Sequence, residues 1–209
     1  MGGTFDPIHL GHLRAAENAR EGLALDEVRF LPAQVPPHRP APVSSARDRF
    51  AMVALATALH PRFVADDLEL QREGPSFTVD TISRLRDQRP DDEVVLVIGS
   101  DTLPELASWK DHERLLRMCT VAVVTRPEDG QRVAPALPSP LMWGRDREGG
   151  SMEDGRPEGT GPAGVRHVPG PGLAVSATEI RRRVREGHSI RYLVPETVAD
   201  YIAKRGLYR

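Results

Sequence analysis

The sequence predicts an α/β protein with a doubly wound parallel sheet, and three observations lead to this fold class. Continuous apolar runs with polar ends, at 93–100 and 120–125, are typical of strands covered on both faces. Helical segments alternate with strand-like segments, which implies right-handed βαβ units. The 209 residues, 39% of them hydrophobic and 28% charged, are enough to bury the core of a single domain, 1–209.

The elements expected in the first half rest on capping residues, alternation and apolar runs. Ser44 or Ser45 can cap a helix, and the alternation of 62–70 favours a strand. In order, we expect a helix at Leu13–Leu25, a strand at Glu27–Ala33, a Pro-rich loop, a helix at 46–60, a strand at 62–70, a capped helix at 76–88 and a strand at 93–100.

In the second half, a helix at 111–119 and a buried strand at 120–125 come before a segment of different composition. Residues of about 127–172 are rich in Gly and Pro, and 144–164 contains few large apolar side chains. Such a composition cannot bury enough surface to order itself firmly. We expect a flexible surface insertion here, and a functional lid is the alternative.

Two helices with clear boundary signals follow the insertion. Ser176 and Glu179 have capping-box spacing, and Gly187 lies where a glycine often ends a helix. Pro195 and Gly206 bound the last expected helix in the same way.

Charge and cysteine content limit the binding partners and the cellular compartment that we expect. The formal net charge is −2, so nothing draws the whole protein to nucleic acid or to an anionic membrane, and an anion site has to be local. The single cysteine, Cys119, is expected in the core; it excludes an internal disulfide and suits a reducing cytoplasm. No apolar run approaches the roughly 20 residues of a membrane span. We expect a cytoplasmic protein without nucleic-acid or membrane partners, and a homo-oligomer is left open.

The opening segment, MGGTFDPIHLGH, combines turn residues with two histidines. Glycines let a backbone approach a phosphate closely, and a helix beginning near Gly11 points its N–H groups back at the turn, beside His9 and His12. The glycine patterns of dinucleotide-binding and P-loop proteins are absent. Zinc is a rival reading, but two histidines supply only two ligands. The other alternative is a pair of structural histidines at a helix end.

A second constellation, SATEIRRR, begins the helix after the insertion. Its arginines crowd a helix start, where cations oppose the macrodipole by a few tenths of a kcal/mol each. Most of them are expected on a solvated face. Ser176, Thr178, backbone N–H groups and one arginine make a grip for a polyphosphate. Two phosphate-type sites indicate phosphoryl or nucleotidyl transfer.

These segments resemble a known enzyme family. GGTFDPIHLGHL is similar to the H-x-G-H signature of the nucleotidylyltransferase superfamily, and VSATEIRRR resembles its C-terminal I-S-x-T-x-x-R motif. The further segments PPHR, SFTVDTISRL, VIGSDTLPELASWKDHERLL, VVTRP and GLYR resemble, in order, the bacterial nicotinate-nucleotide adenylyltransferases. The resemblance covers nearly the whole chain except the Gly-rich segment. It implies a Rossmann-like nucleotidyltransferase fold and adenylyl transfer from ATP, with Mg²⁺, to nicotinate mononucleotide, giving deamido-NAD and pyrophosphate.

The resemblance also implies roles for individual residues. His9, His12 and Arg181 would be catalytic, through contacts with the phosphates of ATP. No residue is assigned as a metal ligand. The nucleotide site would be formed by Gly3, Thr4, Phe5, His9, His12, Gly99, Asp101, Ser176, Thr178 and Arg181.

The acceptor site would use an aromatic face and a carboxylate-binding donor. Trp109 would stack on the pyridine ring, and the backbone N–H of Lys110 and the hydroxyl of Thr78 would bind beside it. Trp109 as a half-buried core residue is the alternative. His38 and Arg39 would reach a phosphate, unless PPHR is a plain Pro-rich turn.

Three departures from the family pattern leave alternatives. Ala177 replaces a common Ser, the Gly-rich segment is longer than expected, and only Met1 precedes Gly2, where the first strand should lie. We expect the natural chain to begin upstream of Met1 with an apolar strand that ends at Gly2. The alternatives are an adenylyltransferase for nicotinamide mononucleotide or phosphopantetheine, and a nucleotide-binding protein without turnover.

Overall fold

A computed structural model describes residues 1–37, 40–125 and 164–209. The predictions for His38, Arg39 and the 127–163 part of the insertion lie outside these residues. Within them the fold is α/β, as predicted, and every strand pairing is parallel.

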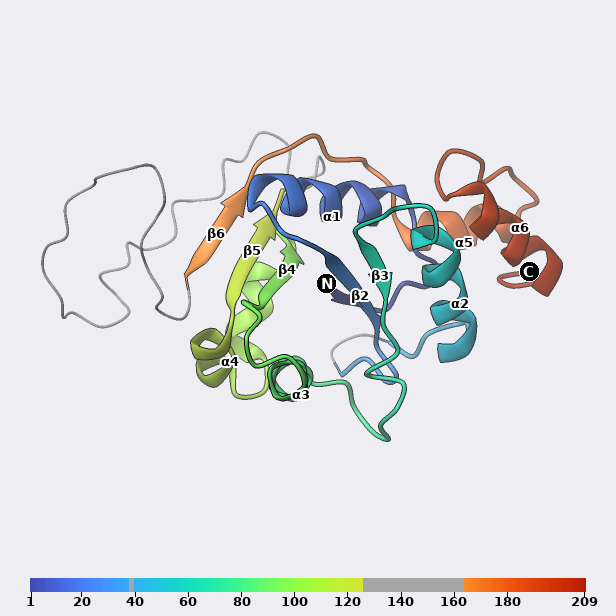
Figure 1. Ribbon diagram of the computed structural model, residues 1–209. Coiled ribbons are helices and arrows are strands. Elements are labelled where there is room, and N and C mark those ends of the chain that lie inside the picture. The colour runs from blue at the N-terminus through green and yellow to red at the C-terminus, as the bar shows by residue number, and fades with distance from the viewer. Residues whose placement is uncertain (38–39, 126–163) are drawn as a thin grey trace, which may run out of the picture.

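The strands form two three-stranded sheets, which lie side by side in Figure 1. Each sheet has its middle strand between two parallel partners, and the registers are continuous. The first sheet has the order β1 (Gly2–Gly3), β2 (Val28–Pro32), β3 (Phe63–Ala65), and the second β4 (Val95–Gly99), β5 (Thr120–Val124), β6 (Val165–Val168).

The strand that was expected to end at Gly2 is present as the two residues Gly2–Gly3. Gly2 pairs with Leu31, and Gly3 with Pro32. The carbonyl of Met1 accepts from the Leu31 N–H at 3.0 Å, and the carbonyl of Gly3 accepts from the Ala33 N–H at 2.9 Å. This short strand extends the first sheet but does not pair with β4, so the two sheets remain separate within the described residues.

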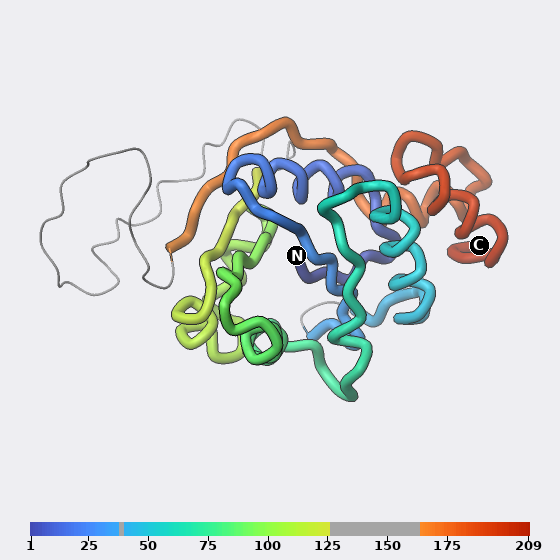
Figure 2. The backbone as a smooth tube through the Cα atoms, in the orientation of Figure 1, coloured from blue at the N-terminus to red at the C-terminus, as the bar shows by residue number. Residues whose placement is uncertain are grey.

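In the part of the chain that the structure describes, six α-helices and one 3₁₀ helix surround the sheets. Their bounds are α1 Leu10–Gly22, α2 Ala46–Thr57, α3 Thr78–Gln88, η1 Leu103–Ser108, α4 His112–Met118, α5 Ala177–Arg185 and α6 Glu196–Arg205. Helix α1 crosses one face of both sheets, whereas α3 and α4 cover the other face of β4 and β5 (Figure 1). The backbone trace in Figure 2 shows α2, α5 and α6 gathered beside β2 and β3.

The expected N-terminal caps of α2 and α5 and the glycines expected after α5 and α6 are confirmed. Ser45 caps α2 by accepting from the Asp48 N–H, and Ser176 caps α5 by accepting from the Glu179 N–H. Gly187 and Gly206 have φ values of +72° and +64° after α5 and α6, the left-handed conformation in which glycine avoids steric cost.

One expected cap is wrong. Helix α3 begins after Phe77, with no side-chain cap. The hydroxyl of Ser76 instead accepts from the backbone N–H of Gln34 at 2.9 Å, across to the end of the first sheet. The Ser76 hydroxyl therefore makes a tertiary hydrogen bond in place of the local bond that would cap the helix.

Two strand expectations also need correction. Of 62–70 only Phe63–Ala65 is a strand, because the Asp66 carboxylate accepts from the Leu68 N–H at 2.9 Å and turns the chain. Val165–Val168, predicted as part of the insertion, is the strand β6 and pairs with β5. This strand completes the second sheet.

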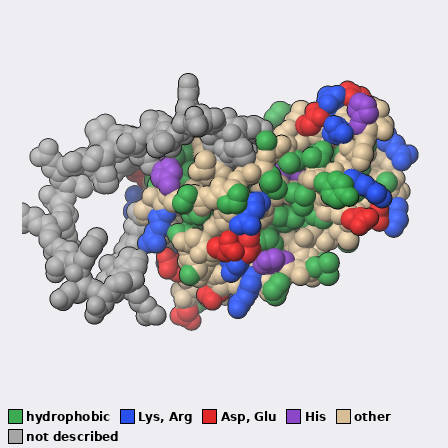
Figure 3. Space-filling model, turned by 90° about the horizontal axis from the view of Figure 1, so that it is seen from above, with side chains coloured by type: hydrophobic (Ala, Val, Ile, Leu, Met, Phe, Trp, Pro, Cys, Tyr) green, Lys and Arg blue, Asp and Glu red, His purple; other side chains and the backbone are tan. Residues whose placement is uncertain are grey.

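On the face seen in Figure 3, basic and acidic side chains are interspersed. Among the helices that the structure describes, none is both long and apolar enough to cross a bilayer.

Candidate active site

A continuous cavity of about 1240 Å³ opens at the carboxyl ends of β1 and β4. In open parallel sheets this edge is where ligands bind. The structure brings to its wall every predicted site residue that it describes: Gly3, Thr4, Phe5, His9, His12, Thr78, Gly99, Asp101, Trp109, Lys110, Ser176, Thr178 and Arg181.

The two histidines are stacked at the start of α1. His9 is the N-cap, only 3% exposed, and its ring lies 3.7 Å from the ring of His12, nearly parallel. The His9 N–H donates to His12 Nδ1 at 3.2 Å. Because Nδ1 accepts this bond, the proton of a neutral His12 ring is carried by Nε2, the form that donates to an anion. Phe5 packs edge-on against His12 at 5.1 Å.

Gly11 leaves room for the close packing between the histidines. A Cβ at Gly11 would lie 3.0 Å from His9 Nδ1 and 3.2 Å from the Leu173 carbonyl. These contacts are tighter than ordinary packing allows, so a side chain here would displace the His9 ring.

The turn that carries the histidines is anchored by Asp6, which is 4% exposed. Its Oδ1 accepts from the Tyr208 hydroxyl at 2.7 Å, from the Ser44 N–H at 3.3 Å and from the Ser44 hydroxyl. Its Oδ2 accepts from the Val43 N–H at 2.7 Å. Burial raises the pKa of Tyr208, so its hydroxyl remains a donor at neutral pH.

Two arginines hold backbone carbonyls of the same turn. Arg49 is 1% exposed; its Nη1 donates to the Thr4 carbonyl at 2.8 Å, and its Nη2 donates to the Gln34 carbonyl at 3.3 Å. Burial lowers the pKa of Arg49. Arg181 Nη1 donates to the Asp6 carbonyl at 2.7 Å.

Of the arginines at the start of α5, Arg181 is the one that lines the cavity within the described residues. Its Nη2 also donates to the Thr178 hydroxyl at 3.3 Å. Arg182 is paired with Glu179 at 2.7 Å, and Arg183 Nε donates to the Ser189 carbonyl at 2.8 Å. Arg181 is thus the arginine of the basic run that a ligand in the cavity would meet.

The opposite wall comes from the second sheet. Thr78 begins α3, and Trp109 follows η1. Lys110 Nζ lies 3.0 Å from Asp80 Oδ2 and 4.6 Å from the centre of the Phe77 ring. Trp109 packs partly against the core of the second sheet and also lines the cavity. It is therefore both a half-buried core residue and part of the cavity wall, the two alternatives that the sequence left open.

Sequence reasoning missed the residues that support the site. Asp6 and Tyr208 fall in segments that were matched to the family, but their contact joins opposite ends of the chain. Arg49 had a readable signal: it precedes the buried Met52 and Val53 by three and four residues, which places it on the core face of α2. Glu69 is also buried, and its Oε1 accepts from the Thr81 hydroxyl at 2.8 Å.

Nothing in the described residues forms a protein-built metal site. No three side chains of His, Cys, Asp or Glu lie together there in a way that could hold a metal ion.

Two helix starts, one containing glycine and one polar, face a single cavity at the edge of parallel β-strands. This arrangement is typical of the nucleotide-binding class of α/β proteins. The Cytidylyltransferase-like family model matches residues 1–183. A structure titled as Plasmodium falciparum nicotinic acid mononucleotide adenylyltransferase complexed with NaAD shares the fold, with a TM-score of 0.73, 19% identity and coverage of 99% of this chain and 94% of that one.

Curated relatives are much closer in sequence. The chain is 42% identical to a probable nicotinate-nucleotide adenylyltransferase from Chromohalobacter salexigens over 212 residues, covering 100% of this chain and 94% of the relative. It is also 42% identical to a protein of the same name from Thermus thermophilus over 209 residues, covering 100% and 97%. The chain belongs to the nicotinate-nucleotide adenylyltransferase family.

Proposed function

We propose that the protein transfers the adenylyl group of ATP to nicotinate mononucleotide, forming nicotinate adenine dinucleotide and pyrophosphate in NAD biosynthesis. The observation that carries the proposal is one cavity with a histidine pair and a serine–threonine–arginine helix start on one side and Trp109, Lys110 and Thr78 on the other.

The reaction needs positioning and charge stabilisation rather than a protein nucleophile. The 5′-phosphate of the mononucleotide is ionised at neutral pH; one of its oxygens attacks the α-phosphorus of ATP. A new P–O bond forms, and the bond to the oxygen that bridges the α- and β-phosphates breaks, so pyrophosphate leaves with the electron pair.

The histidine pair would donate to phosphate oxygens as charge moves toward the pyrophosphate. The Nε2 proton of His12, set by the His9 N–H bond to Nδ1, supports this role. Ser176, Thr178 and Arg181 would hold the β- and γ-phosphates at the start of α5. Arg181 has five N–H donors, and the bonds to Asp6 and Thr178 use one on each Nη atom.

Gly3, Thr4 and Phe5 would line the nucleotide end with Gly99 and Asp101, which lie at the end of β4 and just after it. Trp109 would stack on the pyridine ring of the acceptor. The Lys110 backbone N–H would meet its carboxylate, a group that an amide analogue lacks. Phosphate contacts from His38 and Arg39 remain a prediction.

Mg²⁺ would enter with the triphosphate, whose oxygens are the ligands that this ion prefers. The residues fit such a shared ion, because the carboxylates of the described wall, Asp101 among them, do not form a three-ligand protein site. When bound, the ion would neutralise charge on the leaving pyrophosphate.

The test is a turnover assay with ATP and Mg²⁺ and with three acceptors in parallel: nicotinate mononucleotide, nicotinamide mononucleotide and phosphopantetheine. Pyrophosphate release and the dinucleotide product are measured. We expect turnover with the nicotinate form at a clear advantage over the other two. Preference for either other acceptor, or tight ATP binding without turnover, would refute the proposal.

A histidine variant separates the chemical role from folding. His12→Ala is expected to lower kcat by roughly two to four orders of magnitude, the scale of losing a preorganised donor, with much less effect on ATP affinity. His188→Ala is the matched control, because this exposed residue is paired with Glu186 away from the cavity. Near-normal turnover of His12→Ala would contradict the assigned role.

A further inference from the structure

A segment without helix or strand structure joins β6 to α5 and lies along α1. We call residues 169–175 the strap; it follows Val168, the last residue of β6, and leads to Ser176, the N-cap of α5. Figures 1 and 2 show it running beside α1 from the second sheet toward the helices that pack beside the first. The course of the strap therefore decides where the start of α5 lies relative to the histidine pair.

One face of α1 receives the strap. Its residues recur at spacings of four, three and four, which places them on the same side of the helix: Gly11, Ala15, Asn18 and Gly22. A Cβ at Gly22 would lie 2.8 Å from Cγ1 of Val168, just before the strap. At the other end of the helix, a Cβ at Gly11 would lie 3.2 Å from the Leu173 carbonyl. The strap thus runs antiparallel to α1 and reaches the end that carries the histidines.

Asn18 holds the middle of the strap. It is 4% exposed, and its Nδ2 donates to the Pro171 carbonyl at 3.1 Å. Its Oδ1 accepts from Arg14 Nε at 2.7 Å. Because the amide oxygen is held by Arg14, the amide group is oriented with its N–H donors toward the strap.

The strap also packs very closely against Asn18. A Cβ at Gly170 would lie 2.5 Å from both Cγ and Nδ2 of Asn18, which is far below an ordinary packing distance. A side chain at position 170 would therefore push the strap away from α1. The hydrogen bond to Pro171 and this contact together fix the strap at one point of the helix.

The fixed strap lies between two groups that the reaction would use together. It leads from Pro171 to Ser176, after which Thr178 and Arg181 follow on α5, and α1 begins at the histidine pair. A misplacement of about 1 Å between positioned groups can cost roughly 100-fold in rate. Asn18 itself does not line the cavity, so any effect it has on the ligand is exerted through the strap.

We propose that Asn18 is a positioning residue that sets the start of α5 relative to the histidine pair by clamping the strap. The inference rests on the proposed function, which assigns the β- and γ-phosphates of ATP to the start of α5. Loosening the strap should weaken ligands that place phosphates there, namely ATP and pyrophosphate. Nicotinate adenine dinucleotide has lost the leaving pyrophosphate, so its affinity should not change. A general loss of folding would weaken all three ligands alike.

Three variants loosen the strap in different ways. Asn18→Ala removes the bonds to Pro171 and Arg14, whereas Asn18→Asp keeps the side-chain shape and the Arg14 bond but replaces the donor to Pro171 by an acceptor. Gly170→Ala displaces the strap without changing α1. Calorimetric titration of each variant with ATP, pyrophosphate and nicotinate adenine dinucleotide, in the presence of Mg²⁺, measures the three affinities.

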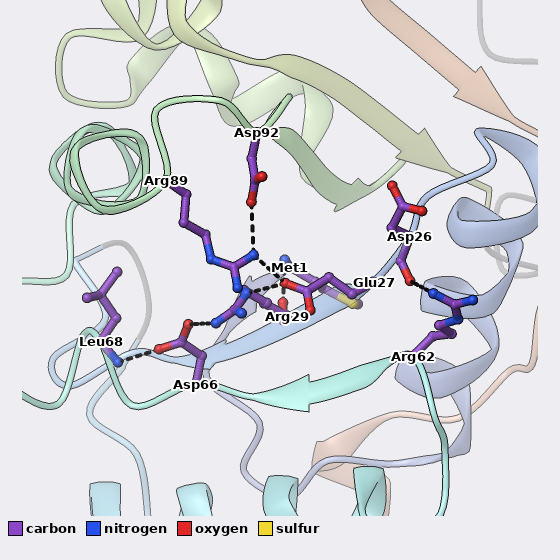
Figure 4. Close-up of polar contacts among 9 residues, drawn as sticks. All are labelled: Met1, Asp26, Glu27, Arg29, Arg62, Asp66, Leu68, Arg89 and Asp92. Atoms are coloured by element: carbon purple, nitrogen blue, oxygen red, sulfur yellow. Dashed lines mark hydrogen bonds and ion pairs between the residues drawn. The ribbon is translucent and has the colours of Figure 1, made fainter.

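Asp66→Ala is the matched control. The Asp66 carboxylate accepts from Arg29 Nη1 and from the Leu68 N–H, each at 2.9 Å (Figure 4). Like Asn18→Ala, this substitution removes one bond from an arginine and one to a backbone group. Asp66 follows β3 and does not line the cavity, so its loss should affect stability alone. Thermal unfolding of all four variants measures that stability.

We expect the three strap variants to raise the Kd of ATP and of pyrophosphate roughly tenfold or more, the scale of one lost hydrogen bond to a charged group. The Kd of the dinucleotide should stay within about twofold, the scale of a few tenths of a kcal/mol. In turnover, the KM for ATP should rise more than the KM for nicotinate mononucleotide. Asp66→Ala should lower Tm and leave all three affinities unchanged.

Unchanged ATP and pyrophosphate affinities in the strap variants would overturn the inference. An equal loss for all three ligands, or the same selective loss in Asp66→Ala, would also overturn it, because either result would show only a general effect on folding. Failure of the proposed function looks different: the unsubstituted chain would bind ATP and pyrophosphate without converting nicotinate mononucleotide, and the comparison of phosphate affinities among the variants would still decide the role of Asn18.

Discussion

Removal of one hydroxyl, in Tyr208→Phe, tests how the turn that carries His9 and His12 is held. The Tyr208 hydroxyl is 2.7 Å from Asp6 Oδ1 and 3.2 Å from the Ser44 hydroxyl, and the side chain is 6% exposed. The substitution creates no cavity. It removes a buried hydrogen bond to a charged group, which contributes about 1.5–3 kcal/mol. In a domain of this size that loss corresponds to a fall in Tm of about 3–12 °C.

Activity should fall as well, because the Asp6 carbonyl accepts from Arg181 and the same turn continues into His9. A small displacement of positioned groups costs roughly tenfold or more in kcat. Tyr201→Phe is the matched control: its hydroxyl donates to Asp48 Oδ1 at 2.9 Å, in a contact between α6 and α2 outside the cavity. Differential scanning calorimetry and steady-state kinetics of both variants decide the matter. An unchanged Tm in Tyr208→Phe, or an equal loss of kcat in Tyr201→Phe, would refute the anchoring role.

Four other outcomes are expected. Trp109→Ala should weaken the binding of nicotinate mononucleotide by about 1–3 kcal/mol in calorimetric titration and leave ATP affinity nearly unchanged. Equal weakening of the binding of both ligands would show that Trp109 is only a core residue. Arg181→Ala should raise the KM for ATP, whereas Arg183→Ala, which loses a surface bond to a carbonyl, should not; equal effects would contradict the assignment. Cys119 is 3% exposed and burial raises its pKa to about 11, so the folded protein should resist alkylation at pH 8, and rapid labelling before unfolding would show that it is accessible. The amino group of Met1 has its pKa lowered to about 6 from 8.0, so the unfolded chain binds more protons between pH 6 and 8; stability should therefore rise across this window, and a chain acetylated at this group should lack the increase.

Local chemistry explains which parts of the fold could be predicted. The runs that became β4 and β5 are apolar on both faces, and the Ser–Glu spacing at Ser176 needs no distant partner to act as a cap. Ser76 has similar local chemistry, but the Gln34 N–H competes for its hydroxyl. Strand β6 was missed because its four residues follow a Gly-rich segment, and their pairing with β5 is visible only in three dimensions.

The candidate site also combines features that local sequence predicts with features that depend on tertiary contacts. The histidine turn and the α5 start are contiguous motifs, so sequence predicted which of their residues would meet in the cavity. The support behind them is assembled from distant elements: Arg49 reaches Thr4 across 45 positions, and Tyr208 reaches Asp6 across 202. Hydrophobic periodicity specifies that Arg49 faces inward but not which carbonyls it will find there.

The contact between Asp6 and Tyr208 has a consequence for how the protein is made. Chains grow on the ribosome at about 5–20 residues per second, so the separation of 202 residues corresponds to about 10–40 s between the synthesis of the turn and that of its partner. Arg181, which holds the carbonyl of the same residue, is also produced late. The strands and α1 can pack while translation continues, and Ser44 and Arg49 can reach the histidine turn early, whereas its contacts with Arg181 and Tyr208 form only at the end. A nascent chain therefore carries its histidines for most of its synthesis without the full set of contacts that hold their turn.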